Sequence, residues 1–144
     1  MTQDARAFNW DSIPVKTGST ADPAAGAQLA AITVAAGKRM ILYSMEATIV
    51  ADATVATRIF FAYIRINGAD TTYASLGGLN ITASQTKLQS FMANSLVITA
   101  GTQYGMHIPL MELPAGATIL MYAVALQAGD NIGAMTYTYK EAPA

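Results

Sequence analysis

Apolar and polar side chains alternate along much of the chain from residue 29 onward, with the period of a β-strand. In residues 39–51 one face is apolar and the opposite face is mixed. The apolar face carries Ile41, Tyr43, Met45, Ala47 and Ile49. Residues 56–66 alternate as well, but both of their faces are largely apolar. We therefore predict one strand with a single buried face and a second strand that is covered on both sides.

Turn signals separate the predicted strands. Asn67-Gly68 tolerates the two positive φ angles of a type I′ turn and predicts a hairpin. Four Ala-Gly pairs read as further strand ends, at Gly37, Gly101, Gly116 and Gly129. Their spacing follows no repeat period, which argues against a solenoid. In residues 84–94 the apolar positions also fit helical spacing, so a helical turn competes with a strand there, and we favour the strand.

About eight strands, with turns at intervals of roughly 8–15 residues, indicate an all-β protein. We expect an antiparallel β-sandwich or jelly roll with an extended N-terminal arm. Residues 29–144 form the predicted β domain, and residues 1–28 form the arm and its linker.

The predicted arm combines an apolar cluster with a linker of small residues. Its apolar members are Phe8, Trp10, Ile13 and Val15. Residues 17–26 are small or polar without periodicity, as in a loop. This separation predicts that the four apolar residues bind a partner rather than the core of their own domain. An arm folded back over its own sandwich is the alternative.

Charge is scarce in this chain. Charged residues make up 12% of the sequence and the net charge is −1, whereas an average soluble domain is about 25% charged. On the strand of residues 56–66, Ile59, Phe61 and Tyr63 oppose another apolar face. A weakly charged protein with such a strand is expected to associate with its own copies, and we expect a homotrimer.

The same numbers exclude other classes of partner. The eight Lys and Arg residues are scattered, which argues against nucleic-acid binding. The longest strongly apolar run, residues 117–126, is about half of the roughly 20 residues that a membrane helix needs. The first ten residues lack the apolar core of a signal peptide. Cysteine is absent, so disulfides and thiolate metal sites are ruled out.

The search for catalytic chemistry finds no signature. His107 is the single histidine, and its apolar neighbours favour a packed strand residue over a ligand or a catalyst. The carboxylates occur singly. Asp52, Asp70 and Asp130 are expected to form turns, and Glu46 is expected to pair with Arg58 or Arg65 on a neighbouring strand. We therefore predict no enzyme activity, no metal and no cofactor.

The order of arm, strands and turns resembles small β-sandwich or jelly-roll proteins of tailed-bacteriophage virions. The segments that carry the resemblance are Ile32–Arg39, Ala53–Arg58, Ile66–Gly68, Leu113–Gly116 and Ala128–Asp130. It covers residues 29–141 and implies a structural protein on the capsid surface, assembled in the host cytoplasm. It further implies a decoration (cement) protein, commonly trimeric, that binds the major capsid protein with a terminal arm. The alternatives are a tail or fibre component, and a module that binds a receptor or carbohydrate through exposed tyrosines.

Overall fold

The computed structural model describes residues 9–66, 72–93 and 98–144. Nearly all regular structure in these residues is β, as the alternation predicted. The strands are β1 (Lys16–Ser19), β2 (Ile32–Thr33), β3 (Lys38–Val50), β4 (Arg58–Arg65), β5 (Thr72–Ile81), β6 (Thr86–Ala93), β7 (Ile98–Ala100), β8 (Gln103–Ile108), β9 (Glu112–Leu113), β10 (Thr118–Val124), β11 (Asn131–Ile132) and β12 (Thr136–Pro143). A single 3-10 turn, η1 (Trp10–Ser12), precedes them.

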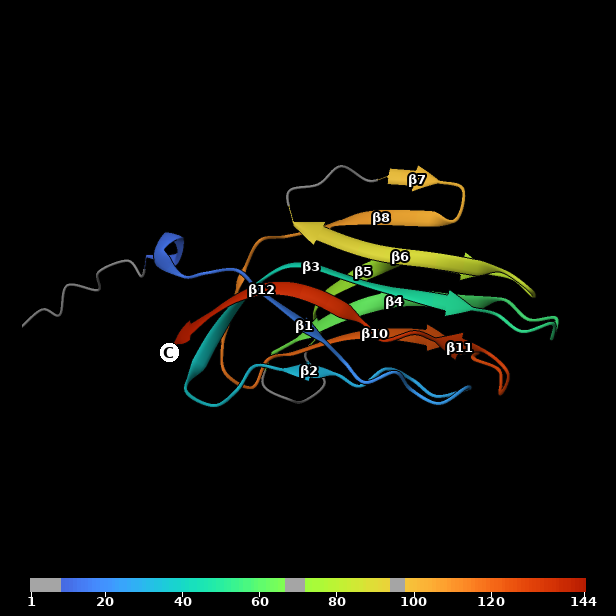
Figure 1. Ribbon diagram of the computed structural model, residues 1–144, viewed down its shortest axis with the longest axis horizontal. Helices are drawn as coiled ribbons and strands as arrows, with labels where there is room; N and C mark the ends of the chain where they lie inside the picture. Colours follow the sequence, from blue (N-terminus) through green and yellow to red (C-terminus); the bar gives the residue numbers. More distant parts are fainter. Residues whose placement is uncertain (1–8, 67–71, 94–97) are drawn as a thin grey trace, which may run out of the picture.

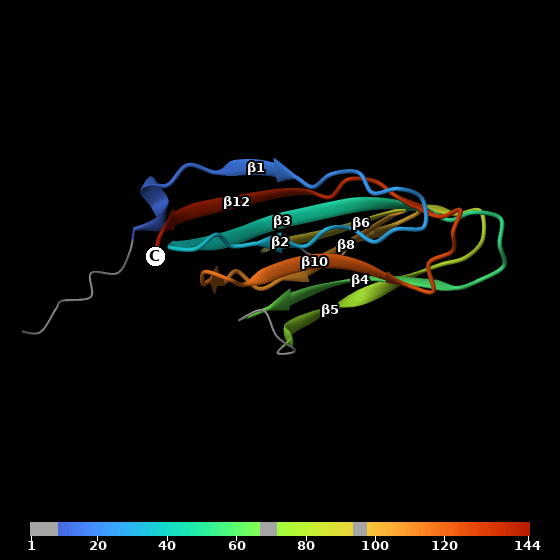
Figure 2. The ribbon, with the colours of Figure 1, turned by 90° about the horizontal axis from the view of Figure 1, so that it is seen from below.

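The strands form two sheets that pack face to face, which confirms the predicted β-sandwich. The eight-stranded sheet has the order β1-β12-β3-β6-β8-β7, with β9 and β11 also paired to β3. The four-stranded sheet has the order β2-β10-β4-β5. Figure 2 shows the two layers edge-on, with β12 and β3 in one and β10 and β4 in the other.

The core lies between the two layers and follows the predicted alternation. In β4 the inward positions include Phe60, Ala62 and Ile64, each 0 to 1% exposed. Their neighbours on β10 include Met121, which pairs with Ala62 and is fully buried. Burial of such side chains stabilises the domain by about 1.5–3 kcal/mol each, so this interface dominates folding.

A β-bulge shifts the facing of β3. Ser44 pairs with Thr138 of β12, but the next pair joins Leu42 to Tyr139, so Tyr43 is an extra residue. On the N-terminal side of the bulge Met40 and Leu42 are buried. On its C-terminal side the buried residues are Met45, Ala47 and Ile49. The prediction of one unbroken apolar face is therefore wrong at Tyr43, because an inserted residue reverses the alternation.

The predicted hairpin joins β4 and β5, which pair antiparallel, although Asn67-Gly68 itself lies outside the described residues. Residues 86–93 form β6, so the strand is confirmed over the helical alternative. One pairing departs from the antiparallel expectation, since β6 runs parallel to β8. Strand β7 precedes β8 in the chain. The two strands are joined by a turn at Gly101 and pair antiparallel.

The predicted linker is partly ordered as a strand. Lys16–Ser19 pair with Tyr139–Thr136 of β12, so β1 forms an edge of the eight-stranded sheet. The expectation of an irregular loop from residue 17 is wrong for residues 17–19. The physical reason is that β12 offers a free row of backbone donors and acceptors, with which the backbone of β1 pairs. Figure 1 shows β1 lying beside β12.

Candidate interaction surfaces

The outer face of the four-stranded sheet carries an apolar patch. Three cross-strand pairs build it: Ile59 with Val124, Phe61 with Tyr122, and Tyr63 with Leu120. We call these six residues the outer patch. Ile59 is 40% exposed, Val124 42% and Tyr122 37%. A strand face open to water ordinarily carries polar residues, so this composition marks a surface suited to contact with protein.

The aromatic rings of the outer patch pack against one another. The ring centroids of Phe61 and Tyr63 lie 4.8 Å apart with an interplanar angle of 80°, which is an edge-to-face contact. Those of Phe61 and Tyr122 are 5.7 Å apart. At one end the guanidinium carbon of Arg65 lies 5.3 Å from the centroid of the Tyr63 ring. The rings thereby hold one another in place, so little side-chain entropy would be lost when a partner covers them.

The four predicted partner-binding residues are placed as follows. Phe8 lies outside the described residues. Trp10 is half-buried, and its indole Nε1 donates a hydrogen bond of 2.9 Å to Glu112 Oε2. Ile13 is half-buried and Val15 is 59% exposed. None of the three described residues belongs to the buried core.

Polar contacts hold the arm to its own domain. Lys140 Nζ of β12 donates to the Trp10 carbonyl oxygen at 2.9 Å, and Lys16 Nζ lies 3.6 Å from Glu141 Oε1. Arg39 donates to Glu112 Oε1 at 3.2 Å, which links β3 to the acceptor of Trp10. The folded-back arm that the sequence left as the alternative is thus the arrangement in the single chain.

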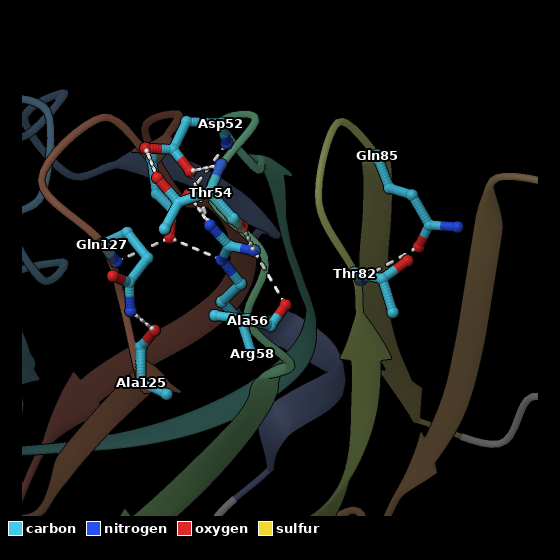
Figure 3. A network of polar contacts seen from close by, with 9 residues as sticks. Asp52, Thr54, Ala56, Arg58, Thr82, Gln85, Ala125 and Gln127 are labelled. Atoms are coloured by element: carbon cyan, nitrogen blue, oxygen red, sulfur yellow. Dashed lines mark hydrogen bonds and ion pairs between the residues drawn. The ribbon is translucent and has the colours of Figure 1, made fainter.

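A buried ionic cluster occupies the end of the sandwich opposite to η1 of the arm (Figure 1). Arg58 and Asp130 are both fully buried, and Asp52 is 24% exposed. Arg58 Nε and Nη2 donate to the two oxygens of Asp130, each at 2.8 Å, and Nη2 also donates to Asp52 Oδ1 at 2.6 Å. Nη1 donates to the carbonyl oxygens of Thr54 and Ala56 at 3.0 and 2.8 Å. Figure 3 shows Asp52, Thr54 and Ala56 around the Arg58 guanidinium.

Hydrogen bonds within the cluster satisfy its buried charges. Asp130 also accepts hydrogen bonds from the backbone amides of Asp52 and Gln127, at 2.9 and 2.7 Å. The hydrogen bonds to Asp130 raise the pKa of Arg58 further. Burial by itself would raise the pKa of Asp130, but the hydrogen bonds from Arg58 and the two amides outweigh it and lower that pKa. Both groups are therefore charged at neutral pH, and the cluster joins the β3–β4 loop, the β10–β11 loop and the start of β4 as a structural clamp.

The ionic cluster corrects one prediction and supports another. Arg58 pairs with Asp52 and Asp130, not with Glu46, whose hydroxyl partner is Thr136. Asp52 and Asp130 do bond backbone amides at strand ends, as turn-forming residues are expected to. The signal that the sequence offered was an arginine at an inward position of β4, in line with Phe60, Ala62 and Ile64.

The described part of the chain assembles no group of metal-binding side chains. His107 lies in β8 and is exposed in the single chain. It therefore does not pack in the core, and its burial in an interface between proteins stays a prediction. No three His, Asp or Glu side chains among the described residues gather closely enough to hold a metal ion. No helix within these residues is long and apolar enough to cross a membrane.

Comparisons with known proteins return viral coat proteins of loosely similar structure. No protein-family model matches the chain, and no curated protein matches it significantly. The Tobacco streak virus coat protein, solved as a dimer, aligns over 97% of this chain and 91% of its own, with 12% identity and a TM-score of 0.41. At that TM-score the alignment identifies neither a family nor a function.

Two structures of infectious bursal virus particles give similar values. The T13 particle aligns with a TM-score of 0.42 and the T=1 particle with 0.41, each at 15% identity over 96% of this chain. This chain spans about a third of those proteins, 34 and 35% respectively.

Proposed function

We propose that this chain is a structural protein of a virus particle, namely a capsid decoration protein of a tailed bacteriophage, and not an enzyme. It forms a homotrimer on the capsid surface and binds the major capsid protein, with assembly in the host cytoplasm. The observation that carries the proposal is the outer patch, an aromatic and aliphatic sheet face that is exposed in the single chain.

The outer patch supports self-association because covering it removes apolar surface from water. Each exposed side chain that becomes buried contributes about 1 kcal/mol or more, and the rings are already ordered. With 12% charged residues the chain has little electrostatic repulsion to oppose the contact. A second copy of this chain is therefore the partner that we assign to the outer patch.

The arm supports the binding of a particle. Val15 is 59% exposed, and Ile13 and Trp10 are only half-buried, so apolar surface remains for a second protein. Aromatic side chains dominate the binding energy of many interfaces. We assign Phe8, Trp10, Ile13 and Val15 to the contact with the major capsid protein, and β1 anchors the segment that carries them to the sheet.

Val124→Glu tests the role of the outer patch. The variant is expected to sediment as a monomer at micromolar concentration, whereas the unaltered chain sediments as a trimer. Val50→Glu is the matched control, because Val50 is equally exposed at 42% but ends β3 in the other sheet. A trimer that survives Val124→Glu, or an unaltered chain that is monomeric, contradicts the assignment.

Deletion of residues 1–15 tests the arm, since it leaves β1 intact. The shortened chain is expected to stay folded and trimeric but to lose binding to purified capsids that lack this protein. Normal capsid binding by the shortened chain would contradict the role of the arm. Binding to tails or fibres in place of capsids would favour the alternative virion role.

A further inference from the structure

A hollow lies on the outer face of the eight-stranded sheet, far from the outer patch on the other sheet. Its volume is about 220 Å³. The residues that line it come from four adjacent strands: Thr17, Ser44, Met45, Glu46, Ser90, Met92, Thr136, Tyr137 and Thr138. We call this hollow the hydroxyl groove.

Strand register explains why hydroxyl groups gather there. Across the sheet, Glu46 pairs with Ser90 on one side and Thr136 on the other. In the next outward-facing row, Ser44 pairs with Met92 and Thr138, and Thr138 pairs with Thr17. Two neighbouring rows of one sheet therefore present five hydroxyls and one carboxylate to the same hollow.

These side chains retain hydrogen-bonding capacity. Ser44 Oγ and Thr138 Oγ1 bond each other at 2.6 Å, and Thr136 Oγ1 donates weakly to Glu46 Oε1 at 3.4 Å. Each hydroxyl has one donor and two acceptor sites, and a carboxylate has about four acceptor sites. The groove can thus offer donors and acceptors at once.

We propose that the hydroxyl groove binds a neutral saccharide, one pyranose ring of a glycan. A sugar ring carries hydroxyls that both donate and accept, which matches the serines and threonines, and Glu46 can accept from two neighbouring sugar hydroxyls. Its C–H face suits the apolar part of the lining, to which Met92 contributes. The volume lies below the roughly 300–1,000 Å³ of sites for drug-sized ligands and so suits a single ring.

Other classes of ligand fit the groove less well. Among the described residues the lining contains no Lys, Arg or His, and Glu46 repels an anion. A peptide strand needs a free backbone edge, whereas β12, β3 and β6 are interior strands whose backbones pair on both sides. A protonated amine could pair with Glu46, but it would leave the rows of hydroxyls without a role. The saccharide proposal extends beyond the structural function and does not depend on it.

Saturation-transfer NMR on the full chain tests the proposal. The probes are the methyl glycosides of glucose, galactose, mannose and N-acetylglucosamine, each at about 10 mM, which detects millimolar dissociation constants. At least one glycoside is expected to receive saturation. Glu46→Gln is expected to weaken the binding of that glycoside about fivefold or more, because a charged acceptor becomes a neutral one. The double variant Ser44→Ala with Thr138→Val is expected to abolish saturation transfer to the glycoside.

Thr86→Val is the matched control, since Thr86 lies on β6 in the same sheet but does not line the groove. It is expected to leave saturation unchanged. Glu46 is exposed, so Glu46→Gln keeps the test valid even where the double variant fails to fold. The proposal is overturned if no glycoside receives saturation. It is also overturned if both groove variants give the same saturation as the unaltered chain. Binding of n-butylamine without binding of any glycoside also overturns it and assigns the groove to amines.

Discussion

At the scale of single residues, Arg58 is the side chain with the largest structural consequence. A guanidinium in the core is tolerated because all five of its N–H groups have acceptors, two on Asp130, one on Asp52 and two backbone carbonyls. Breaking a buried ion pair leaves the remaining charge unpaired in a medium that solvates it poorly. The cluster is therefore sensitive to the loss of any one member.

Asp130→Asn is expected to lower the thermal midpoint by about 10 °C or more at neutral pH, because Arg58 loses its buried counter-charge. Differential scanning calorimetry measures the midpoint. Asp22→Asn is the control, since Asp22 is exposed in the segment before β2, and it is expected to change the midpoint by no more than about 2 °C. Equal midpoints for the two variants would contradict the clamp.

The same cluster predicts how stability falls in acid. Asp130 has a folded-state pKa below its ordinary value, so its contribution is complete above the unfolded pKa of 3.8 and is lost as pH falls through the folded pKa. Below about pH 4 the difference in midpoint between the unaltered chain and Asp130→Asn is expected to shrink. A difference that persists undiminished to pH 2 would show that the charge of Asp130 is not the cause.

The sequence predicted residues well where alternation alone decides burial and less well where partners decide it. Phe60, Ala62 and Ile64 face the core as expected. The partners of Arg58 were assigned wrongly because Asp130 is 72 positions away and reaches it through a loop, which no local pattern encodes.

At the scale of elements, β1 is the feature that the sequence missed. Strand β1 contains Gly18, and composition alone reads such a segment as a loop. The missing side chain is what lets the strand lie against β12, since a Cβ on Gly18 would collide with the ring of Tyr137. The bulge at Tyr43 was missed for a related reason, because one inserted residue leaves no mark on composition.

Gly18→Val is expected to loosen β1, because the added side chain and the Tyr137 ring cannot share one space. Amide exchange of residues 16–19, followed by mass spectrometry, is expected to accelerate about tenfold or more, while β4 keeps its protection. Ser19→Val, at an exposed position of the same strand, is the control and is expected to leave exchange slow. Unchanged exchange in Gly18→Val would show that Tyr137 can move aside without cost.

At the scale of the whole molecule, the two sheets present unlike outer faces. The four-stranded sheet shows aromatic and aliphatic side chains, and the eight-stranded sheet shows the hydroxyl groove. The alternation predicted that residues 56–66 are covered on both sides, but in the single chain the outer face of β4 is open at Ile59, which is 40% exposed. The groove could not be predicted, since it depends on the register between strands distant in sequence.

Self-association through the outer patch is expected to depend little on sodium chloride. Apolar contacts are not screened, whereas contacts between exposed charges weaken beyond a Debye length of about 10 Å at 0.1 M salt. Sedimentation equilibrium between about 0.05 and 0.5 M salt is expected to give association constants within about threefold of each other. A steep decrease with salt would point to an interface built from ion pairs instead.

The position of β12 affects how the chain folds during synthesis. Strand β12 lies between β1 and β3 in the larger sheet. The ribosome therefore makes β1 and β3 long before the strand that pairs with both of them. Until then the edge of β3 that β12 will occupy is unpaired along most of its length. Contacts between segments so distant in sequence slow folding. Until β12 has left the ribosome, the growing chain therefore exposes the long edge of β3 to neighbouring nascent chains. Pairing of β12 then completes the sheet and closes that edge.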